Sequence, residues 1–202
     1  RPSGDRTMAR ALIEALRLAG HEVEVACRFS SFEGGGDTRR QARLAALGTR
    51  LAAALIRRYR LRPAEHRPRL WFTYHLYHKA PDRLGPAVSR ALAIPYVVAE
   101  ASHAPKQARA PWAEGLLAAS AAIAQADAII GLNAADRACV LPLLADPDRY
   151  HALAPFLDTR PWRAARENQA RSRAELARRA GFDPAVPWLV CVAMTRPGDK
   201  LA

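Results

Sequence analysis

The stretch from residue 85 to residue 132, GPAVSRALAIPYVVAEASHAPKQARAPWAEGLLAASAAIAQADAIIGL, decides the fold of this chain. It predicts a helix over Gly85–Ala93, a buried strand over Pro95–Ala99, a helix from Pro111 to about Ala126 and a strand over Ala128–Leu132. Strands joined by helices of about ten residues or more form right-handed βαβ units, in which the strands run parallel. The stretch therefore predicts a parallel sheet covered by helices.

The sequence on either side repeats this alternation. Apolar spacing and turn residues predict helices over Asp5–Ala19, Thr38–Arg60 and Ala134–Leu144, and strands over Glu22–Cys27, Leu70–Tyr74 and His151–Ala154. The expected fold is α/β, a Rossmann-like doubly wound parallel sheet.

The character of the sequence changes near Thr159, where it becomes polar and rich in arginine. We predict a Rossmann-like domain over residues 1–158, a linker with one helix over residues 159–186, and the first strand of a second domain within residues 187–202. One strand cannot form a domain, and Ser3-Gly4-Asp5 is typical of a loop that follows a strand. We therefore expect the sequence to be truncated at both ends.

Positive charge is concentrated in one segment. The 202 residues carry a net charge of +12, and residues 37–70 hold ten arginines against Asp37 and Glu65. Arg39, Arg43, Arg50 and Arg57 recur on one face of the predicted helix. A solvated helix face, contact with an anionic membrane surface and nucleic-acid binding all remain open. No aromatic stacking platform accompanies the arginines, which makes nucleic acid the least favoured partner.

Cysteine and histidine spacing argues against metal and disulfide chemistry. The three cysteines are far apart, and no CxxC pair exists. His75 and His78 have HxxH spacing but lack an evident third ligand, so no metal is expected. The longest apolar run is interrupted by Gln125 and Asp127 before it reaches the length of a membrane span. We expect a cytoplasmic protein, with peripheral attachment to the inner face of the membrane as an open alternative.

Polar residues follow most of the predicted strands. Because the carboxyl ends of parallel strands meet at one edge of a sheet, the following residues are expected to converge there: Ser3, Gly4, Asp5, His75, Glu100, His103 and Asn133. The Ser3-Gly4-Asp5 turn could bind a polar ligand at a helix N-terminus or simply cap the helix. His103 could bind a hydroxyl or phosphate group, or satisfy the backbone of its own loop.

The order of these segments resembles the GT-B retaining glycosyltransferases of family 4, also called group 1. The resemblance rests on Ser3-Gly4-Asp5 before a helix and HEVEV at residues 21–25, on Ala93–Glu100 followed by His103, on ADAIIGLN at residues 126–133, and on APFLD at residues 154–158 before Pro161-Trp162. It implies an enzyme with two facing domains, which transfers sugar from a nucleotide-sugar to a glycan or lipid-linked acceptor. The first domain would hold the acceptor and the second the donor.

The resemblance also implies roles for single residues. Ser3-Gly4-Asp5 matches the family's glycine-rich loop, and His103 matches the histidine that lines the reaction centre. Arg196 and Lys200 are the nearest matches to the pair that holds the donor diphosphate, although the family's Gly-Arg pair stands here as Ala193-Met194. The resemblance thus implies that positively charged side chains neutralise the donor diphosphate in place of a metal ion, and no cofactor is expected.

Two other functions stay open at this point. A GT-B sugar-nucleotide epimerase would share the architecture, and a non-enzymatic Rossmann-like module could use the basic surface to bind nucleic acid.

Overall fold

The computed structural model describes residues 4–109 and 111–190. The chain divides into two compact units, with the boundary between Leu157 and Asp158. Each unit is described by itself.

The first unit is built on a parallel sheet. Its described strands are β1 (Trp71–Leu76), β2 (Tyr96–Ala101), β3 (Ala128–Gly131) and β4 (Tyr150–Ala152), in the spatial order β1-β2-β3-β4. All three neighbouring pairs run parallel. The prediction of an α/β, Rossmann-like fold is confirmed.

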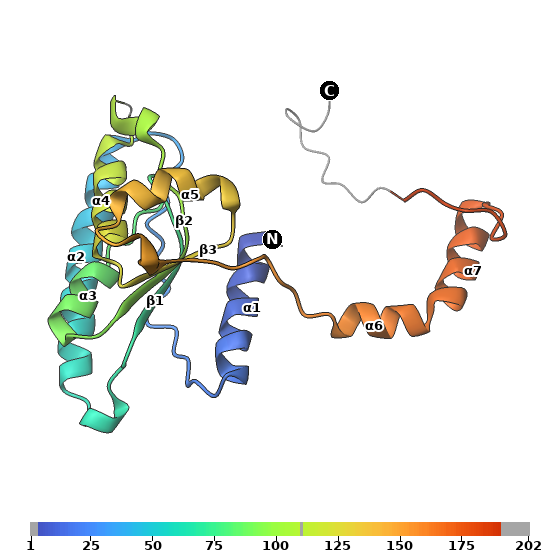
Figure 1. Ribbon diagram of the computed structural model, residues 1–202, viewed down its shortest axis with the longest axis horizontal. Coiled ribbons are helices and arrows are strands. Elements are labelled where there is room, and N and C mark those ends of the chain that lie inside the picture. Colours follow the sequence, from blue (N-terminus) through green and yellow to red (C-terminus); the bar gives the residue numbers. More distant parts are fainter. Residues whose placement is uncertain (1–3, 110, 191–202) are drawn as a thin grey trace. The chain divides into compact units, whose positions relative to one another are not determined.

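Helices flank this sheet. They are α1 (Gly4–Leu18), α2 (Thr38–Arg60), α3 (Gly85–Leu92), α4 (Ala113–Gln125) and α5 (Ala134–Val140). In Figure 1, α2, α3 and α4 lie on one side of the strands and α1 lies on the other. The helix predicted over Ala134–Leu144 is shorter than expected: α5 ends at Val140, and a 3-10 turn over Leu141–Leu143 follows it. Pro142 lacks the N–H that would continue the α-helical ladder, which accounts for the early end.

Two groups of buried side chains hold the unit together. The larger one joins the sheet to α4 and α5 through Val98, Ile123, Ile129 and Val140, each with no exposed surface. The smaller joins α2 to α3 through residues that include Leu55, Tyr59 and Val88. Burial of this apolar surface is the main stabilising contribution to the fold.

The Asp82 carboxylate ties the start of α3 to the sheet. One oxygen, Oδ1, accepts from the backbone N–H groups of Leu84 and Gly85, both at 2.8 Å. The other, Oδ2, accepts from the hydroxyls of Thr73 at 2.5 Å and Tyr96 at 2.8 Å. A single acidic side chain thus satisfies helix-start donors and two strand hydroxyls together.

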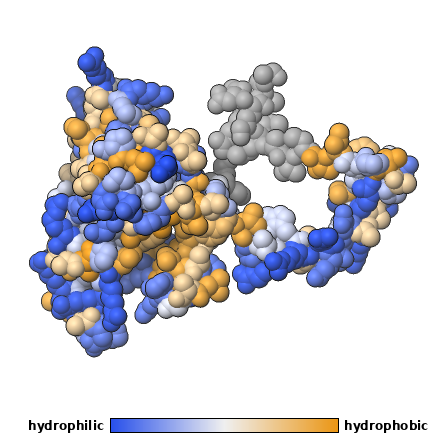
Figure 2. Space-filling view, viewed as in Figure 1, coloured by the Kyte–Doolittle hydropathy of each residue, from blue (hydrophilic) through white to orange (hydrophobic). Residues whose placement is uncertain are grey.

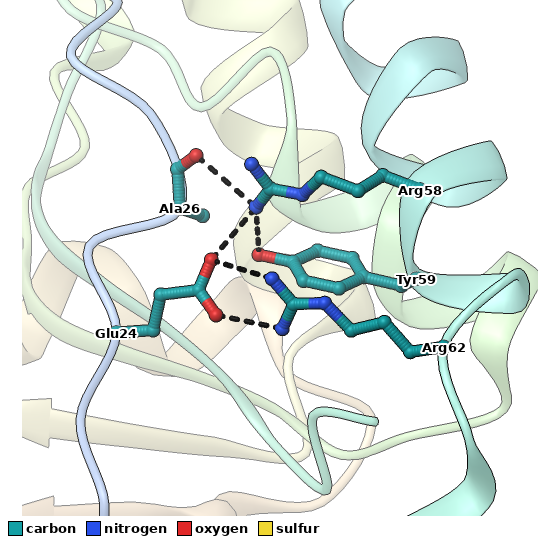
Figure 3. Close-up of polar contacts among 5 residues, drawn as sticks. All are labelled: Glu24, Ala26, Arg58, Tyr59 and Arg62. Carbon is teal, nitrogen blue, oxygen red and sulfur yellow. Dashed lines mark hydrogen bonds and ion pairs between the residues drawn. The ribbon is translucent and has the colours of Figure 1, made fainter. Parts of the chain in front are cut away.

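The predicted strand over Glu22–Cys27 is wrong. This segment is irregular, and no strand among the described residues pairs with it. Glu24 instead binds Arg58 at 2.8 Å and Arg62 at 2.7 Å, and Arg58 also donates to the carbonyl of Ala26 (Figure 3). Alternating side chains make a strand only where a neighbouring backbone supplies hydrogen bonds. Here side chains of the α2 region fix the segment.

Over its described residues, 158–190, the second unit contains two helices where one was predicted. The helices are α6 (Arg160–Glu167) and α7 (Gln169–Ala180), separated by Asn168. Gly181 ends α7 in the left-handed conformation. The strand predicted within residues 187–202 is not formed at residues 187–190, and residues 191–202 lie outside the described part of the chain.

Candidate functional site

Two adjacent strands carry the same backbone distortion at the carboxyl edge of the sheet. His75 in β1 and Glu100 in β2 have positive φ values of 63° and 59°. They occupy matching positions, between the paired residues Tyr74↔Ala99 and Leu76↔Ala101. A left-handed residue other than glycine costs on the order of 1–2 kcal/mol. Such strain at two facing positions marks this edge as a candidate site.

Asp5 joins this pair from a different part of the chain. It lies in the first turn of α1 rather than capping that helix, and its Oδ2 is 3.7 Å from Nδ1 of His75. The pKa of Tyr74 is raised, first by burial and then by the hydrogen bond and charge of Glu100 and by the charge of Asp5. Both carboxylates therefore lie close enough to Tyr74 to raise its pKa.

A continuous chain of rings runs from this site. His75 stacks on Tyr77 with ring centroids 4.9 Å apart, and Tyr77 meets His78 edge-on at 5.5 Å. His78 contacts Trp112 at 5.9 Å, and the Lys79 amino group lies 4.4 Å from the Trp112 ring centroid. Flat ring faces beside carboxylates and an imidazole suit a ligand that has both apolar faces and hydroxyl groups.

Sequence reasoning missed Tyr74, Tyr77 and Trp112 as members of this site. The signal was present in the run WFTYHLYH over residues 71–78, whose aromatic residues continue past the end of β1. The apolar pattern predicts a strand only over Leu70–Tyr74, where aromatic residues are ordinary, and Tyr77 falls in the loop beyond it.

The other predicted site residues have different positions. His103 is half-buried in the loop after β2, and its imidazole bonds to no residue that the structure describes. Asn133 is exposed and caps α5, since its side-chain oxygen accepts from the N–H of Ala135 at 3.0 Å. Gly4 begins α1, whereas Ser3, Arg196 and Lys200 lie outside the described residues. Asn133 thus has a structural role that the sequence left open.

The glycine-rich loop at residues 34–36 encloses an acidic side chain of the protein itself. The buried Glu33 carboxylate accepts from the N–H groups of Gly35 and Gly36, each at 2.7 Å, and from the Gln41 amide at 3.3 Å. The N–H groups that could have received a phosphate are therefore occupied.

His78 lies at a small hollow next to this loop. Its Nε2 atom is buried without a hydrogen-bond partner among the described residues, as is Nε of Arg83. The hollow has a volume of ≈ 10 Å³, which is room for about one water molecule and too little for a sugar. Within the described part of the chain, no three His, Cys, Asp or Glu side chains gather closely enough to hold a metal ion.

We expect the stability of the protein to fall as the pH drops below about 6.5, because of His78. Burial lowers the pKa of this imidazole, and the charges of Lys79 and Lys106 lower it further. The unfolded chain then binds the proton more readily than the folded one, so stability is lost on acidification. Denaturation at about pH 7.5 and about pH 5.5 measures this, and His78→Gln should flatten the difference. An unchanged pH dependence in that variant would assign the effect to other groups.

Comparison with protein-family models finds no match to this chain, and comparison with curated protein sequences finds none either. Within residues 4–109 and 111–190, no helix combines the length and apolar character needed to cross a membrane.

Proposed function

We propose that this chain carries the acceptor-side domain of a retaining glycosyltransferase that uses a nucleotide-sugar donor. The observation that carries the proposal is the strained pair His75 and Glu100, which lies at the sheet edge where open α/β folds bind ligands. The aromatic rings beside it and the nearby Asp5 carboxylate provide both contacts that a saccharide needs. The family resemblance of the sequence supplies the reaction class.

Different described residues would make different kinds of contact with the acceptor. Asp5 and Glu100 would accept hydrogen bonds from acceptor hydroxyls, and the stacked rings of His75 and Tyr77 would contact an apolar sugar face. Holding the acceptor in one orientation lowers the entropic part of the barrier to transfer. In the proposed enzyme, Arg196 and Lys200 would neutralise the charge that develops on the departing diphosphate.

The direct test is acceptor binding by the 202-residue chain. Saturation-transfer NMR with octyl glucoside, octyl mannoside and octyl N-acetylglucosaminide should detect contact between the sugar protons and the aromatic rings. Tyr77→Ala should weaken the signal, and Tyr150→Phe serves as a control on a tyrosine of a different strand. A folded chain that transfers saturation to none of these glycosides would contradict the proposal.

His103→Ala is expected to lower sugar transfer by about tenfold or more in the complete encoded protein, with little change in stability. The imidazole bonds to no described residue, so the fold does not depend on it. Incorporation of labelled sugar from UDP-glucose, UDP-N-acetylglucosamine and GDP-mannose into octyl glycosides measures the effect. Unchanged turnover with a working donor would remove His103 from the reaction centre.

A further inference from the structure

The arginines of residues 37–70 fall into two groups with different surroundings. Several are bound within the protein: Arg58 and Arg62 bind Glu24 (Figure 3), Arg60 donates to the carbonyl of Ala91, and Arg67 donates to two backbone carbonyls. In contrast, Arg40 and Arg69 are exposed and have no side-chain hydrogen bond or ion pair with any described residue, and the same holds for the arginines on one face of α2, which are Arg39, Arg43, Arg50 and Arg57. We call these last four the arginine stripe.

The arginine stripe forms a nearly straight line on α2. At about 100° per residue, its members at positions 39, 43, 50 and 57 fall within about 40° of one another around the helix axis. At about 1.5 Å per residue, the stripe extends for about 27 Å along the helix. Ala46 and Ala53 are the other residues on this line, and both are exposed. Short side chains between them leave the guanidinium groups free to meet a common plane.

The opposite face of α2 is buried in the protein. Its buried residues include Gly48, Ala52, Leu55 and Tyr59, which pack mainly against α3 and its start. The stripe consequently faces directly away from the unit's own core, and hydrophilic residues cover most of the visible flank on which α2 lies (Figure 2). Insertion of an apolar helix face into a bilayer is excluded, because that face is already occupied.

We propose that the arginine stripe docks the protein electrostatically on an anionic lipid surface. Guanidinium groups form paired hydrogen bonds with phosphate oxygens, and lipid headgroups in a bilayer offer a plane of mobile phosphates that adapts to the spacing of the stripe. The residues on the line offer no aromatic ring to stack on a base and no amide to read one. This docking is independent of the proposed sugar transfer.

Vesicle flotation of the 202-residue chain tests the proposal. At about 0.1 M salt, vesicles with about 30% phosphatidylglycerol should bind the chain, and pure phosphatidylcholine vesicles should not. A basic side chain at such a surface contributes about fivefold to partitioning, so the triple variant R43Q/R50Q/R57Q should bind on the order of 100-fold more weakly. Binding of the unchanged chain should also fall steeply at about 0.5 M salt.

A matched control removes the same charge elsewhere. Arg163, Arg166 and Arg171 are also exposed and unpaired among the described residues, and R163Q/R166Q/R171Q should retain most of the binding. Circular dichroism verifies that both triple variants fold. Equal binding to neutral vesicles, or equal loss in the two variants, would overturn the proposal. A single-stranded RNA oligonucleotide can be added as a competitor. If it released the chain from the vesicles at a phosphate concentration below that of the phosphatidylglycerol present, the stripe would be assigned to nucleic acid instead.

Discussion

Replacing Asp82 with alanine is expected to lower the free energy of unfolding by about 3–4 kcal/mol, because it removes one acceptor from four donors. The largest part of this loss comes from the Tyr96 hydroxyl. Tyr96 has only 1% of its surface exposed, so its hydroxyl would remain inside the protein as an unsatisfied donor. Two N–H groups at the start of α3 would lose their partner as well. Chemical denaturation followed by circular dichroism measures the loss.

Two further variants separate the contributions of Asp82. Asp82→Asn keeps an oxygen that accepts from the N–H groups of Leu84 and Gly85. The hydroxyls of Thr73 and Tyr96 can turn to accept from its amide group. The loss of unfolding free energy should therefore be less than half of that caused by Asp82→Ala. Thr73→Val removes a single hydroxyl and should cost about 1 kcal/mol. If alanine and asparagine at position 82 proved equally destabilising, the loss would come from the negative charge rather than from the number of hydrogen bonds.

The parts of the fold that sequence reasoning predicted correctly depend on local signals. Helix α2 was predicted with its observed ends, Thr38 and Arg60, because its apolar spacing is regular. In the structure Asp37 caps its start by accepting a hydrogen bond from the N–H of Arg40. Strands β2 and β3 were recognised because buried parallel strands are short continuous apolar runs. Each of these signals lies within the element that it specifies.

The wrong strand at Glu22–Cys27 arose because the deciding interaction lies elsewhere in the chain. Glu22–Cys27 alternates as a strand should, but its conformation depends on Arg58 and Arg62, which are more than 30 residues away. For the site, the sheet edge predicted that Asp5, His75 and Glu100 would converge. The left-handed backbone at two of them was not predictable, because positive φ is uncommon in residues other than glycine and the enrichment of histidine there is too weak to single out one position.

The strained pair offers the most discriminating test of the site, since replacement by glycine relieves the backbone strain and removes the proposed ligand contacts in one step. Glycine adopts positive φ without steric cost, so His75→Gly and Glu100→Gly should each be about 1 kcal/mol more stable than the alanine variant at the same position. Both glycine variants should nevertheless lower acceptor binding by about 100-fold, because the side chains that the strain presents to the ligand are gone. Thermal unfolding and the NMR binding assay give the two readouts.

The third described residue with positive φ other than glycine provides the control. Ala93, at 51°, ends α3 and donates its N–H to the carbonyls of Arg90 and Ser89, which is an ordinary role for a left-handed residue at a helix end. Ala93→Gly should gain about 1 kcal/mol and leave glycoside binding unchanged. Strain at Ala93 serves helix termination, whereas no helix ends at His75 or Glu100. The contrary result is that the glycine variants at positions 75 and 100 bind glycosides with the same affinity as Ala93→Gly. In that case the distortion would be a feature of strand packing, and the acceptor site would lie elsewhere on the sheet edge.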